Sequence, residues 1–467
     1  MRPEVLFDLG SAVLAVVGVA FARGVGERYL VPLVPDGVGE LRVAAPGEGA
    51  WRALAVAAAE GRTIPAIAPD GGRAADGGGG ADGGAVLAAD GGPGRVAGAL
   101  VCRPAPGLAA LVDGGAAAVA ALDERPLGAD QSNTSVVLGE RLLVKAFRRV
   151  EPGLNPDLEL TAWLSEEVGF GAAPRLAGFA ELVTADGAGT VALVEEFIAD
   201  GADAYEALAE QLTGWLLSPG TVTVEYATEI ADDLGSLTAA LHVALSDRAE
   251  PEEFAPRPAT RDEVRAWARD GRTQLDRALE VVAAVDPGLA AELRAMAPAI
   301  AERLTAFEAL PATPVLTRVH GDYHLGQVLA TPGGFRIVDF EGEPLRPLED
   351  RRRHGSPMRD VASMLRSLDH VGRSAGRRAE RRYGGLLDSP GLDLEGWLAR
   401  VRERFLDAYR RGLREHGAAF ELDPALVDAF EIEKETYEFT YAATYLPSWL
   451  WAPTAGMRGL LAREPGP

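Results

Sequence analysis

The segment RVHGDYHLGQVL, residues 318–329, places a carboxylate, Asp322, five residues before an amide, Gln327. A second carboxylate, Asp339, follows in the run FRIVDFEGEP. Carboxylate and amide oxygens suit Mg²⁺, which takes its remaining ligands from water and substrate phosphates. A further carboxylate nearby can orient and deprotonate a hydroxyl group. The three residues therefore predict phosphoryl transfer to a hydroxyl, with Asp322 as the base and Gln327 and Asp339 as metal ligands.

A predicted β-hairpin positions these three side chains. Gln327 adjoins the apolar run QVLA, and the turn TPGG, residues 331–334, then reverses the chain into FRIVDF. Such a hairpin brings Gln327 and Asp339 to one end, and Asp322 lies on the loop before it. Each residue alone also fits an ordinary role, as a capping aspartate, a surface glutamine or a buried ion-pair partner. The predicted convergence of all three favours phosphoryl transfer. Protein-kinase-like enzymes have the same arrangement of a loop aspartate, an amide five residues later and a second aspartate on the following hairpin.

A lysine in an apolar strand forms the second part of the predicted site. Lys145 lies in LLVKAF, where a charged side chain needs a partner. Glu159 follows on a helix predicted in NPDLELTAWLSEEVGF, which Asn155 can cap. A strand lysine paired with a helix glutamate holds the α- and β-phosphates of ATP in kinases, so ATP is the predicted nucleotide. The alternatives are an edge lysine that reaches solvent and a glutamate on a solvated helix face.

The segment DQSNTSVVLGE precedes Lys145 in place of a Gly-rich loop. Its side chains and backbone N–H groups can close over phosphates, although such residues also form ordinary turns; the candidates are Ser132, Asn133, Thr134 and Ser135. Because the sequence has neither a G-x-G-x-x-G loop nor an activation segment ending like A-P-E, a protein kinase is the weaker interpretation.

Composition narrows the class of protein. Asp and Glu number 69 against 46 Lys and Arg, a net charge of -23 that disfavours nucleic-acid binding and tolerates a cationic small substrate. Cys102 is the single cysteine, which fits a reducing cytoplasm. The apolar run from Leu9 is too short to span a membrane, and a buried strand or helix explains it better than a signal peptide. We expect a cytoplasmic protein with no membrane, nucleic-acid or obligate protein partner.

The pattern of strands and helices predicts three parts. Residues 1–92 mix apolar runs with turns and include most of a Gly/Asp-rich excursion at 68–94. Residues 93–200 contain strand-like runs around one helix. Residues 201–467 are mostly helical, with one strand-rich interruption that carries Asp322.

Five segments resemble, in order, the actinobacterial maltokinases, which belong to the aminoglycoside-phosphotransferase-like kinases: DQSNTSVVLGERLLVKAFRR, PGLNPDLEL, RVHGDYHLGQVL, IVDFEGEPLRP and SPMRDVASMLRS. The resemblance implies an α+β, bilobal, eukaryotic-protein-kinase-like fold, with an N-terminal cap subdomain, a strand-rich N-lobe and a mostly helical C-lobe. It also implies that the interlobe hinge meets adenine through Glu196, Phe197 and Ile198. His320 and Asp360 would support the catalytic loop, although Asp360 also suits the first turn of a helix.

The C-terminal segment YEFTYAATYLPSW, residues 437–449, departs from the maltokinase pattern Y-E-x-x-N-R-P-D-W. Tyr445 and Leu446 replace Asn-Arg, Ala442 replaces an acid, and Ser448 replaces Asp. In such kinases the C-terminal helices wall the sugar pocket, so a changed wall favours a changed sugar. The chain is similar to a related actinobacterial group that phosphorylates glucosamine.

Glucosamine needs polar partners for its hydroxyl groups and an acid for its ammonium. The predicted substrate-binding residues are His324, Glu435, Glu438, Tyr441 and Trp449, and Glu341, Glu343 and Trp451 are also available. Plain core packing is the alternative for the tryptophans. We predict phosphorylation of glucosamine to glucosamine 6-phosphate with ATP and Mg²⁺. The alternatives are a maltokinase that makes maltose 1-phosphate and a nucleotide-binding regulatory pseudokinase.

Overall fold

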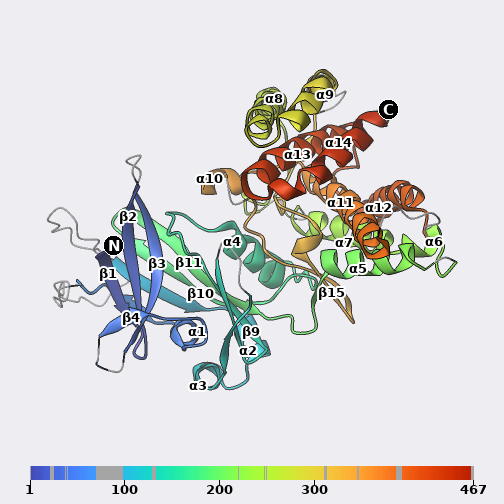
Figure 1. Cartoon of the computed structure of the whole chain (residues 1–467). Helices are drawn as coiled ribbons and strands as arrows, with labels where there is room; N and C mark the ends of the chain where they lie inside the picture. The colour runs from blue at the N-terminus through green and yellow to red at the C-terminus, as the bar shows by residue number, and fades with distance from the viewer. Residues whose placement is uncertain are drawn as a thin grey trace. The chain divides into compact units, whose positions relative to one another are not determined.

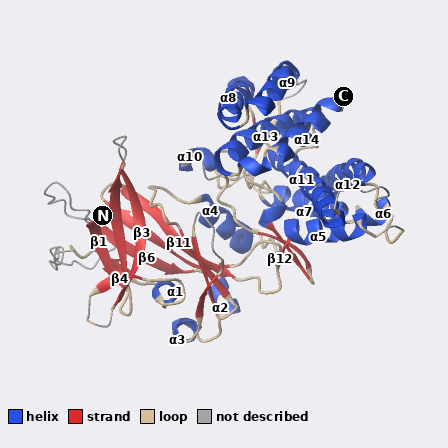
Figure 2. Ribbon diagram, viewed as in Figure 1, coloured by secondary structure: helices blue, strands red, loops and turns tan. Residues whose placement is uncertain are grey.

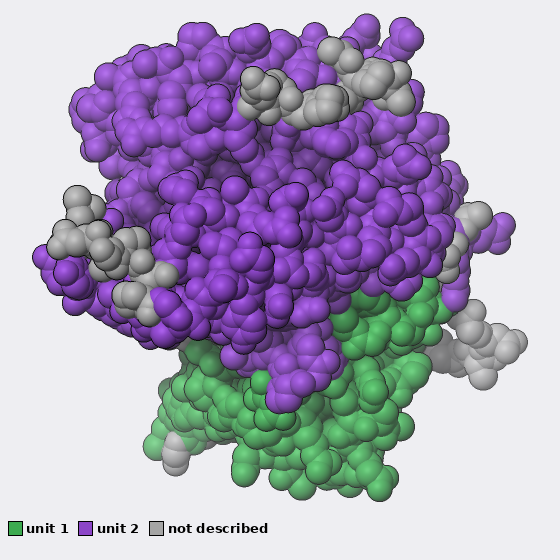
Figure 3. Space-filling view, turned by 90° about the vertical axis from the view of Figure 1, so that its right-hand side faces the viewer, with its two compact units in different colours: residues 1–200, 344–351 green, residues 201–343, 352–467 purple. Residues whose placement is uncertain are grey.

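Strands dominate the N-terminal part of the chain and helices dominate the remainder (Figures 1 and 2). The computed structural model describes residues 2–21, 26–36, 38, 40–69, 98–128, 133–218, 220–246, 248, 250–309, 313–343, 346–384 and 392–463. The chain divides into two compact units, residues 1–200 with 344–351 and residues 201–343 with 352–467 (Figure 3). The predicted α+β class, with a strand-rich N-terminal part and a helical C-terminal part, is confirmed.

The first unit contains two sheets, ordered β1-β2-β3-β4 and β5-β6-β10-β11-β9-β8-β7, in which neighbouring strands are antiparallel. Its strands are β1 Arg2–Asp8, β2 Val13–Ala20, β3 Gly26–Pro35, β4 Leu41–Val43, β5 Thr63–Pro65, β6 Gly98–Pro104, β7 Glu124–Pro126, β8 Thr134–Leu138, β9 Leu142–Ala146, β10 Leu176–Thr184 and β11 Gly187–Glu196. Its helices are α1 Ala50–Ala59, α2 Gly107–Leu111, α3 Gly115–Ala120, α4 Pro156–Ala162, the π-helix η1 Trp163–Glu167 and α10 Leu348–Arg351. The apolar run after Leu9 forms β2, as the preferred interpretation allowed.

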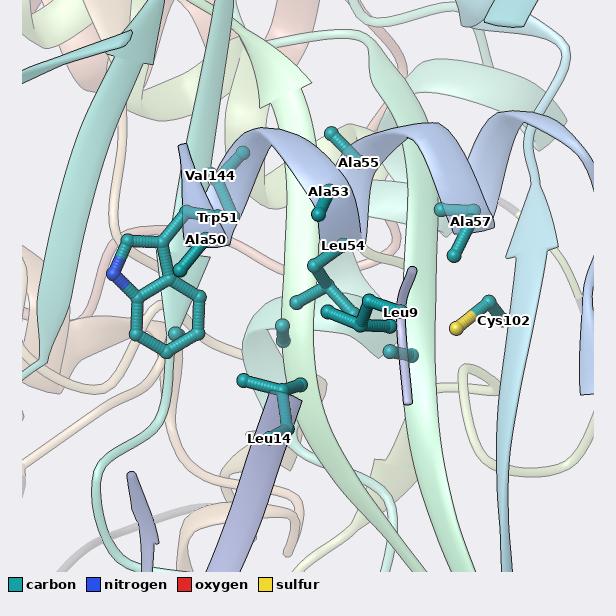
Figure 4. Close-up of a cluster of buried hydrophobic side chains, with 14 of the residues drawn as sticks. Leu9, Leu14, Ala50, Trp51, Ala53, Leu54, Ala55, Ala57, Cys102 and Val144 are labelled. Carbon is teal, nitrogen blue, oxygen red and sulfur yellow. The ribbon is translucent and has the colours of Figure 1, made fainter. Parts of the chain in front are cut away.

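One hydrophobic core joins the two sheets and α1. Figure 4 shows Trp51 and Leu54 of α1 beside Leu14 of β2 and Val144 of β9, and all four are buried. The core therefore takes side chains from both the predicted cap, 1–92, and the predicted N-lobe. Burying one such leucine contributes roughly 1.5–3 kcal/mol. The division into cap and lobe stays a prediction, and most of the excursion at 68–94 lies outside the described residues.

Local sequence explains the elements that carry Lys145. Leu138 of β8 pairs with Leu142 of β9 across a tight turn, in which Gly139 and Glu140 both have positive φ, 56° and 53°. The Asn155 side chain accepts the N–H of Asp157 at 2.8 Å and caps α4, as predicted.

Long helices form most of the second unit, namely α5 Ala204–Leu216, α7 Ile230–Ala244, α8 Arg261–Val285, α9 Pro287–Thr305, α11 Pro357–Tyr383, α12 Leu394–Glu415, α13 Pro424–Tyr445 and α14 Trp451–Ala462. The short elements are α6 Val224–Ala227, the 3₁₀ helices η2 Ala306–Ala309, η3 Leu325–Gln327 and η4 Pro447–Trp449, and the strands β12 Ala202–Asp203, β13 Arg257–Pro258, β14 Val315–Leu316, β15 Val328–Thr331 and β16 Gly334–Ile337. Helices α7 and α12 approach closely at Gly235, where a Cβ atom would lie 2.4 Å from the Phe405 carbonyl oxygen.

Two further features bear on the sequence-based expectations. Residues 344–351 group with the first unit, although the sequence places them in the C-terminal part. In the described part of the chain, we find no helix that combines the length and the apolar character needed to cross a membrane.

Candidate active site

The predicted hairpin at 328–337 is present in the second unit. Strands β15 and β16 pair from Val328↔Ile337 to Thr331↔Gly334. Just beyond the open end, the Gln327 Nε2 donates to Asp339 Oδ2 at 3.1 Å. The hairpin thus brings these two side chains together as expected, and their role as metal ligands stays a prediction.

Asp339 has an unusual backbone conformation directly after the hairpin. Its φ is 65°, and among the described residues only Glu140 is another non-glycine with positive φ. Aspartate tolerates this left-handed region better than most residues, yet the conformation persists only where the surrounding structure enforces it. Such positions cluster at functional sites, which agrees with the role predicted for Asp339.

Asp360 holds the backbone of the loop that carries Asp322. From the first turn of α11, its buried carboxylate accepts the N–H of His320 at 2.8 Å and of Gly321 at 3.0 Å. His242 of α7 lies 3.2 Å from the same carboxylate and contacts Tyr409 through its other ring nitrogen. These are the contacts that a supporting role for Asp360 requires.

His320 connects the catalytic loop to the hairpin. Its Nε2 lies 3.2 Å from the Val338 carbonyl oxygen, and its ring packs against Tyr323 and Phe340, with centroids 5.4 and 5.0 Å away. The loop that carries Asp322 and the segment that carries Asp339 are therefore held to each other.

Asp322 is half-buried, with a side chain 20% exposed, and a lysine and a histidine lie beside its carboxylate. Lys434 Nζ lies 3.4 Å from Oδ1, and the ring Nε2 of His324 lies 3.7 Å from Oδ2. Burial raises the pKa of Asp322, but Lys434 and then His324 outweigh it and hold that pKa below its usual value. Asp322 is therefore ionised at neutral pH, as a proton acceptor must be.

Lys434 on α13 is a site residue that the sequence-based interpretation missed. Besides Asp322, its ammonium contacts Glu343 and Glu438, each at 3.5 Å. Burial lowers its pKa, but these carboxylates raise that pKa well above the usual value. The composition of the sequence could have pointed to Lys434. Of the 46 Lys and Arg residues, only Lys145 and Lys434 are lysines.

The predicted sugar-binding residues lie in different surroundings. His324 contacts Asp322 directly, and Glu438 contacts the same lysine as Asp322 does. Tyr441 is 38% exposed and stacks on Tyr437, with ring centroids 6.4 Å apart. These three positions remain candidates for the acceptor site.

Glu435 and Trp449 belong to another cluster, formed with α11. The buried carboxylate of Glu435 lies 3.0 Å from His370 Nε2 and 3.7 Å from Arg366. Burial lowers the pKa of His370, but Glu435 reverses this and raises it. The Trp449 ring packs edge-on against His370 and Trp451. The ammonium-binding role predicted for Glu435 has less geometric support, because its carboxylate already faces two cationic side chains.

In the first unit, the buried Lys145 pairs with Asp157, whose carboxylate lies 2.7 Å from Nζ. The sequence offered Glu159 on the same helix, and its role stays a prediction. Asp157 was missed because NPDLEL contains two acids, and the residue types alone do not show that Asp157 lies at hydrogen-bond distance from the lysine.

The remaining nucleotide candidates lie around β8 and at the end of β11. Asn133 is buried, Ser135 pairs across strands with Lys145, and the Thr134 hydroxyl accepts from Arg148. Ser132 lies outside the described residues.

The backbone of the predicted hinge is partly engaged within the first unit. The N–H groups of Glu196 and Phe197 donate to carbonyl oxygens of Arg175 and Arg141, both at 2.9 Å. The hinge role of residues 196–198 stays a prediction.

Comparisons with known proteins agree on one family. A model of the phosphotransferase enzyme family (APH) matches residues 123–419. The chain is 32% identical over 470 residues to a glucosamine kinase of Streptacidiphilus jiangxiensis, covering 99% of this chain and 91% of that protein. It is 30% identical over 339 residues to a glucosamine kinase of Mycolicibacterium smegmatis, covering 72% of this chain and 79% of that protein.

Solved structures extend this agreement to the fold. A glucosamine kinase in complex with glucosamine, ADP and inorganic phosphate matches with a TM-score of 0.70 and 29% identity, covering 98% of this chain and 93% of that one. Another crystal form of a glucosamine kinase matches with a TM-score of 0.74 and 29% identity, covering 99% and 94%. The family match spans more than half of the chain and includes Lys145, Asp322 and Asp339. The chain therefore belongs to the phosphotransferase enzyme family.

Proposed function

We propose that this chain is an ATP-dependent sugar kinase that phosphorylates glucosamine on its 6-hydroxyl group. The observation that carries the proposal is the group of carboxylates at the catalytic base, where Asp322, Glu343 and Glu438 all contact the ammonium of Lys434. A site lined by carboxylates favours an acceptor that carries a positive charge. The resemblance to glucosamine kinases along nearly the whole chain supports the same sugar.

The proposed reaction is a direct transfer between two oxygens. Asp322 accepts the proton of the sugar hydroxyl while that oxygen bonds to the terminal phosphorus of ATP. The bond from phosphorus to the bridging oxygen breaks, and ADP leaves with the electron pair. Lys145 would hold the α- and β-phosphates, with Asp157 or Glu159 fixing its ammonium.

Gln327 and Asp339 fit the proposed metal site. Their side chains meet at hydrogen-bond distance and offer one neutral and one anionic oxygen, a donor set that suits Mg²⁺ when phosphates and water complete it. When bound, Mg²⁺ would neutralise charge that develops on the transferred phosphate. Asp339 supplies the only charge of the pair, so its carboxylate would dominate metal affinity.

Replacing Gln327 should weaken the binding of Mg²⁺ without abolishing phosphoryl transfer. We expect Gln327→Ala to raise the Mg²⁺ concentration for half-maximal rate, and Asp339→Ala to remove nearly all activity, because glutamine is a neutral ligand. Mn²⁺ binding in the presence of ATP, followed by electron paramagnetic resonance, would check affinity independently of turnover. Thr331→Ala, at the far end of the hairpin, is the matched control. Full wild-type activity in EDTA would contradict the metal requirement.

The acceptor is tested by initial rates on a sugar panel. We expect kcat/KM for glucose to be about 10- to 100-fold lower than for glucosamine, because a hydrogen bond to a charged group contributes about 1.5–3 kcal/mol. N-acetylglucosamine, which loses the charge and gains bulk, should be slower still, and maltose weak or inert. The position of the phosphate in the product, read by nuclear magnetic resonance, checks the 6-hydroxyl.

Two outcomes would overturn the glucosamine proposal. Faster turnover of maltose, with phosphate on the anomeric oxygen, would establish the maltokinase alternative. Nucleotide binding without turnover of any sugar would favour a regulatory pseudokinase.

A further inference from the structure

Lysine is used at two positions in this chain, Lys145 and Lys434, although Lys and Arg together number 46. Both lysines contact carboxylates that are buried or half-buried. The ammonium of lysine is compact and can lie among several carboxylates, whereas the guanidinium of arginine is planar and larger. In a chain that otherwise uses arginine, lysine at position 434 indicates a site that requires the smaller cation.

Lys434 joins carboxylates from three segments of the second unit. Its Nζ lies 3.4 Å from Asp322 on the catalytic loop, 3.5 Å from Glu343 after the hairpin and 3.5 Å from Glu438 one helical turn away. The ring of Tyr437 lies 4.8 Å from the same nitrogen. The Lys434 side chain is only 15% exposed. Its ammonium is therefore held among these three carboxylates and is not a solvated surface charge.

Several charged groups lie around Asp322. The carboxylates of Asp322, Glu343 and Glu438 all contact the ammonium of Lys434. Further titratable groups near Asp322 are His324, whose ring nitrogen lies 3.7 Å from the carboxylate, and His320, whose Nδ1 accepts the Asp322 N–H at 3.4 Å. The phenol of Tyr437, beside Lys434, also senses the charge of Asp322. A sugar ammonium entering here would meet an acidic site whose net charge depends on Lys434.

We propose that Lys434 is a positioning residue for the transfer reaction, which fixes the carboxylate of Asp322 and sets the net charge of the acceptor site. The proposal rests on the proposed sugar-kinase function. It assigns Glu343 and Glu438, which flank Lys434, to recognition of a cationic acceptor.

Removing the lysine charge should change how the rate depends on pH. Burial raises the pKa of Asp322, and Lys434 is the strongest group that lowers it. Asp322 accepts a proton only when ionised, so activity is present above its pKa and is lost as pH falls through it. With Lys434 in place the loss of activity lies below the pH at which an ordinary aspartate is protonated, and without the lysine charge it should move upward.

The test compares Lys434→Met and Lys434→Arg with the wild type, using kcat and KM for glucosamine and glucose between pH 5 and 9. We expect Lys434→Met to lower kcat and to move the acidic loss of kcat/KM upward into this pH range, because burial raises the pKa of Asp322 and its strongest opposing charge is then gone. Its KM for glucosamine should not rise, because the site becomes more acidic. Lys434→Arg should keep the wild-type pH profile, with a lower kcat from its bulk.

A chemical rescue separates loss of charge from misfolding. Lys434→Cys, treated with 2-bromoethylamine, forms a thioether that restores an ammonium at nearly the length of lysine, with bromide as the leaving group. Cys102 is buried and burial raises its thiol pKa to about 11, so the wild type treated in the same way serves as the control. Recovered turnover and a restored pH profile are the expected result.

The outcomes distinguish this inference from the proposed function. A wild-type enzyme that does not phosphorylate glucosamine contradicts the proposed function. If the wild type phosphorylates glucosamine, two results would overturn the role of Lys434. One is an unchanged pH profile in Lys434→Met, and the other is a chemically rescued variant that stays inactive.

Discussion

Asp322→Asn should lower turnover by about 10²- to 10⁴-fold, the usual contribution of a general base. Asparagine keeps the shape of aspartate but cannot accept the proton of the sugar hydroxyl. The fold should survive, because Asp360 holds the loop through backbone N–H groups, and Lys434 keeps Glu343 and Glu438 as partners. Initial rates on glucosamine, together with nucleotide affinity by calorimetry, would measure the effect.

A matched substitution controls for the loss of one negative charge elsewhere. Asp286→Asn changes the residue that caps α9, where it accepts the Leu289 N–H at 2.9 Å. Asparagine caps helices as well as aspartate does, so both stability and turnover should stay near wild type. If Asp322→Asn turned over as fast as Asp286→Asn, the assignment of the base would be refuted.

Lys145→Met should destabilise the first unit by about 3–5 kcal/mol, the usual cost of removing one partner from a buried ion pair. The Asp157 carboxylate, 1% exposed, lies 2.7 Å from the lysine ammonium and would lose it. Turnover should fall as well, because the same ammonium is proposed to hold the phosphates of ATP. Native-state hydrogen exchange in β9 and α4 would report the local stability.

The double variant Lys145→Met/Asp157→Leu separates these two effects. Replacing both members of a buried pair with apolar groups of similar size is often neutral or stabilising. We therefore expect the double variant to regain most of the stability and none of the turnover. Recovery of activity together with stability would show that Lys145 serves the fold and not the nucleotide.

Features that depend on neighbours along the chain could be predicted from sequence. The turn at 331–334 and the apolar runs around it determine a hairpin, and a hairpin by itself brings Gln327 and Asp339 together. The same holds for the cap that Asn155 forms on α4. In each case a few consecutive residues set the dihedral angles and the pairing register, so no distant contact is needed.

Sequence could not decide which of several similar side chains meets a distant partner. In α4 two acids are available, and the fold brings Asp157, which the sequence-based interpretation did not name, to 2.7 Å from Lys145. In α13, Glu435 and Glu438 lie one turn apart, yet Glu435 faces His370 and Glu438 faces Lys434.

The reason is that the contacts of a helical side chain depend on the rotation of its helix against elements far away in sequence. Helix α13 has apolar and charged residues around much of its circumference, so its own pattern does not identify the catalytic side. Sequence alone thus determined the residue types, the hairpin and the family resemblance. Only tertiary packing decided that Lys434 lies beside Asp322, because that contact joins two segments 112 residues apart.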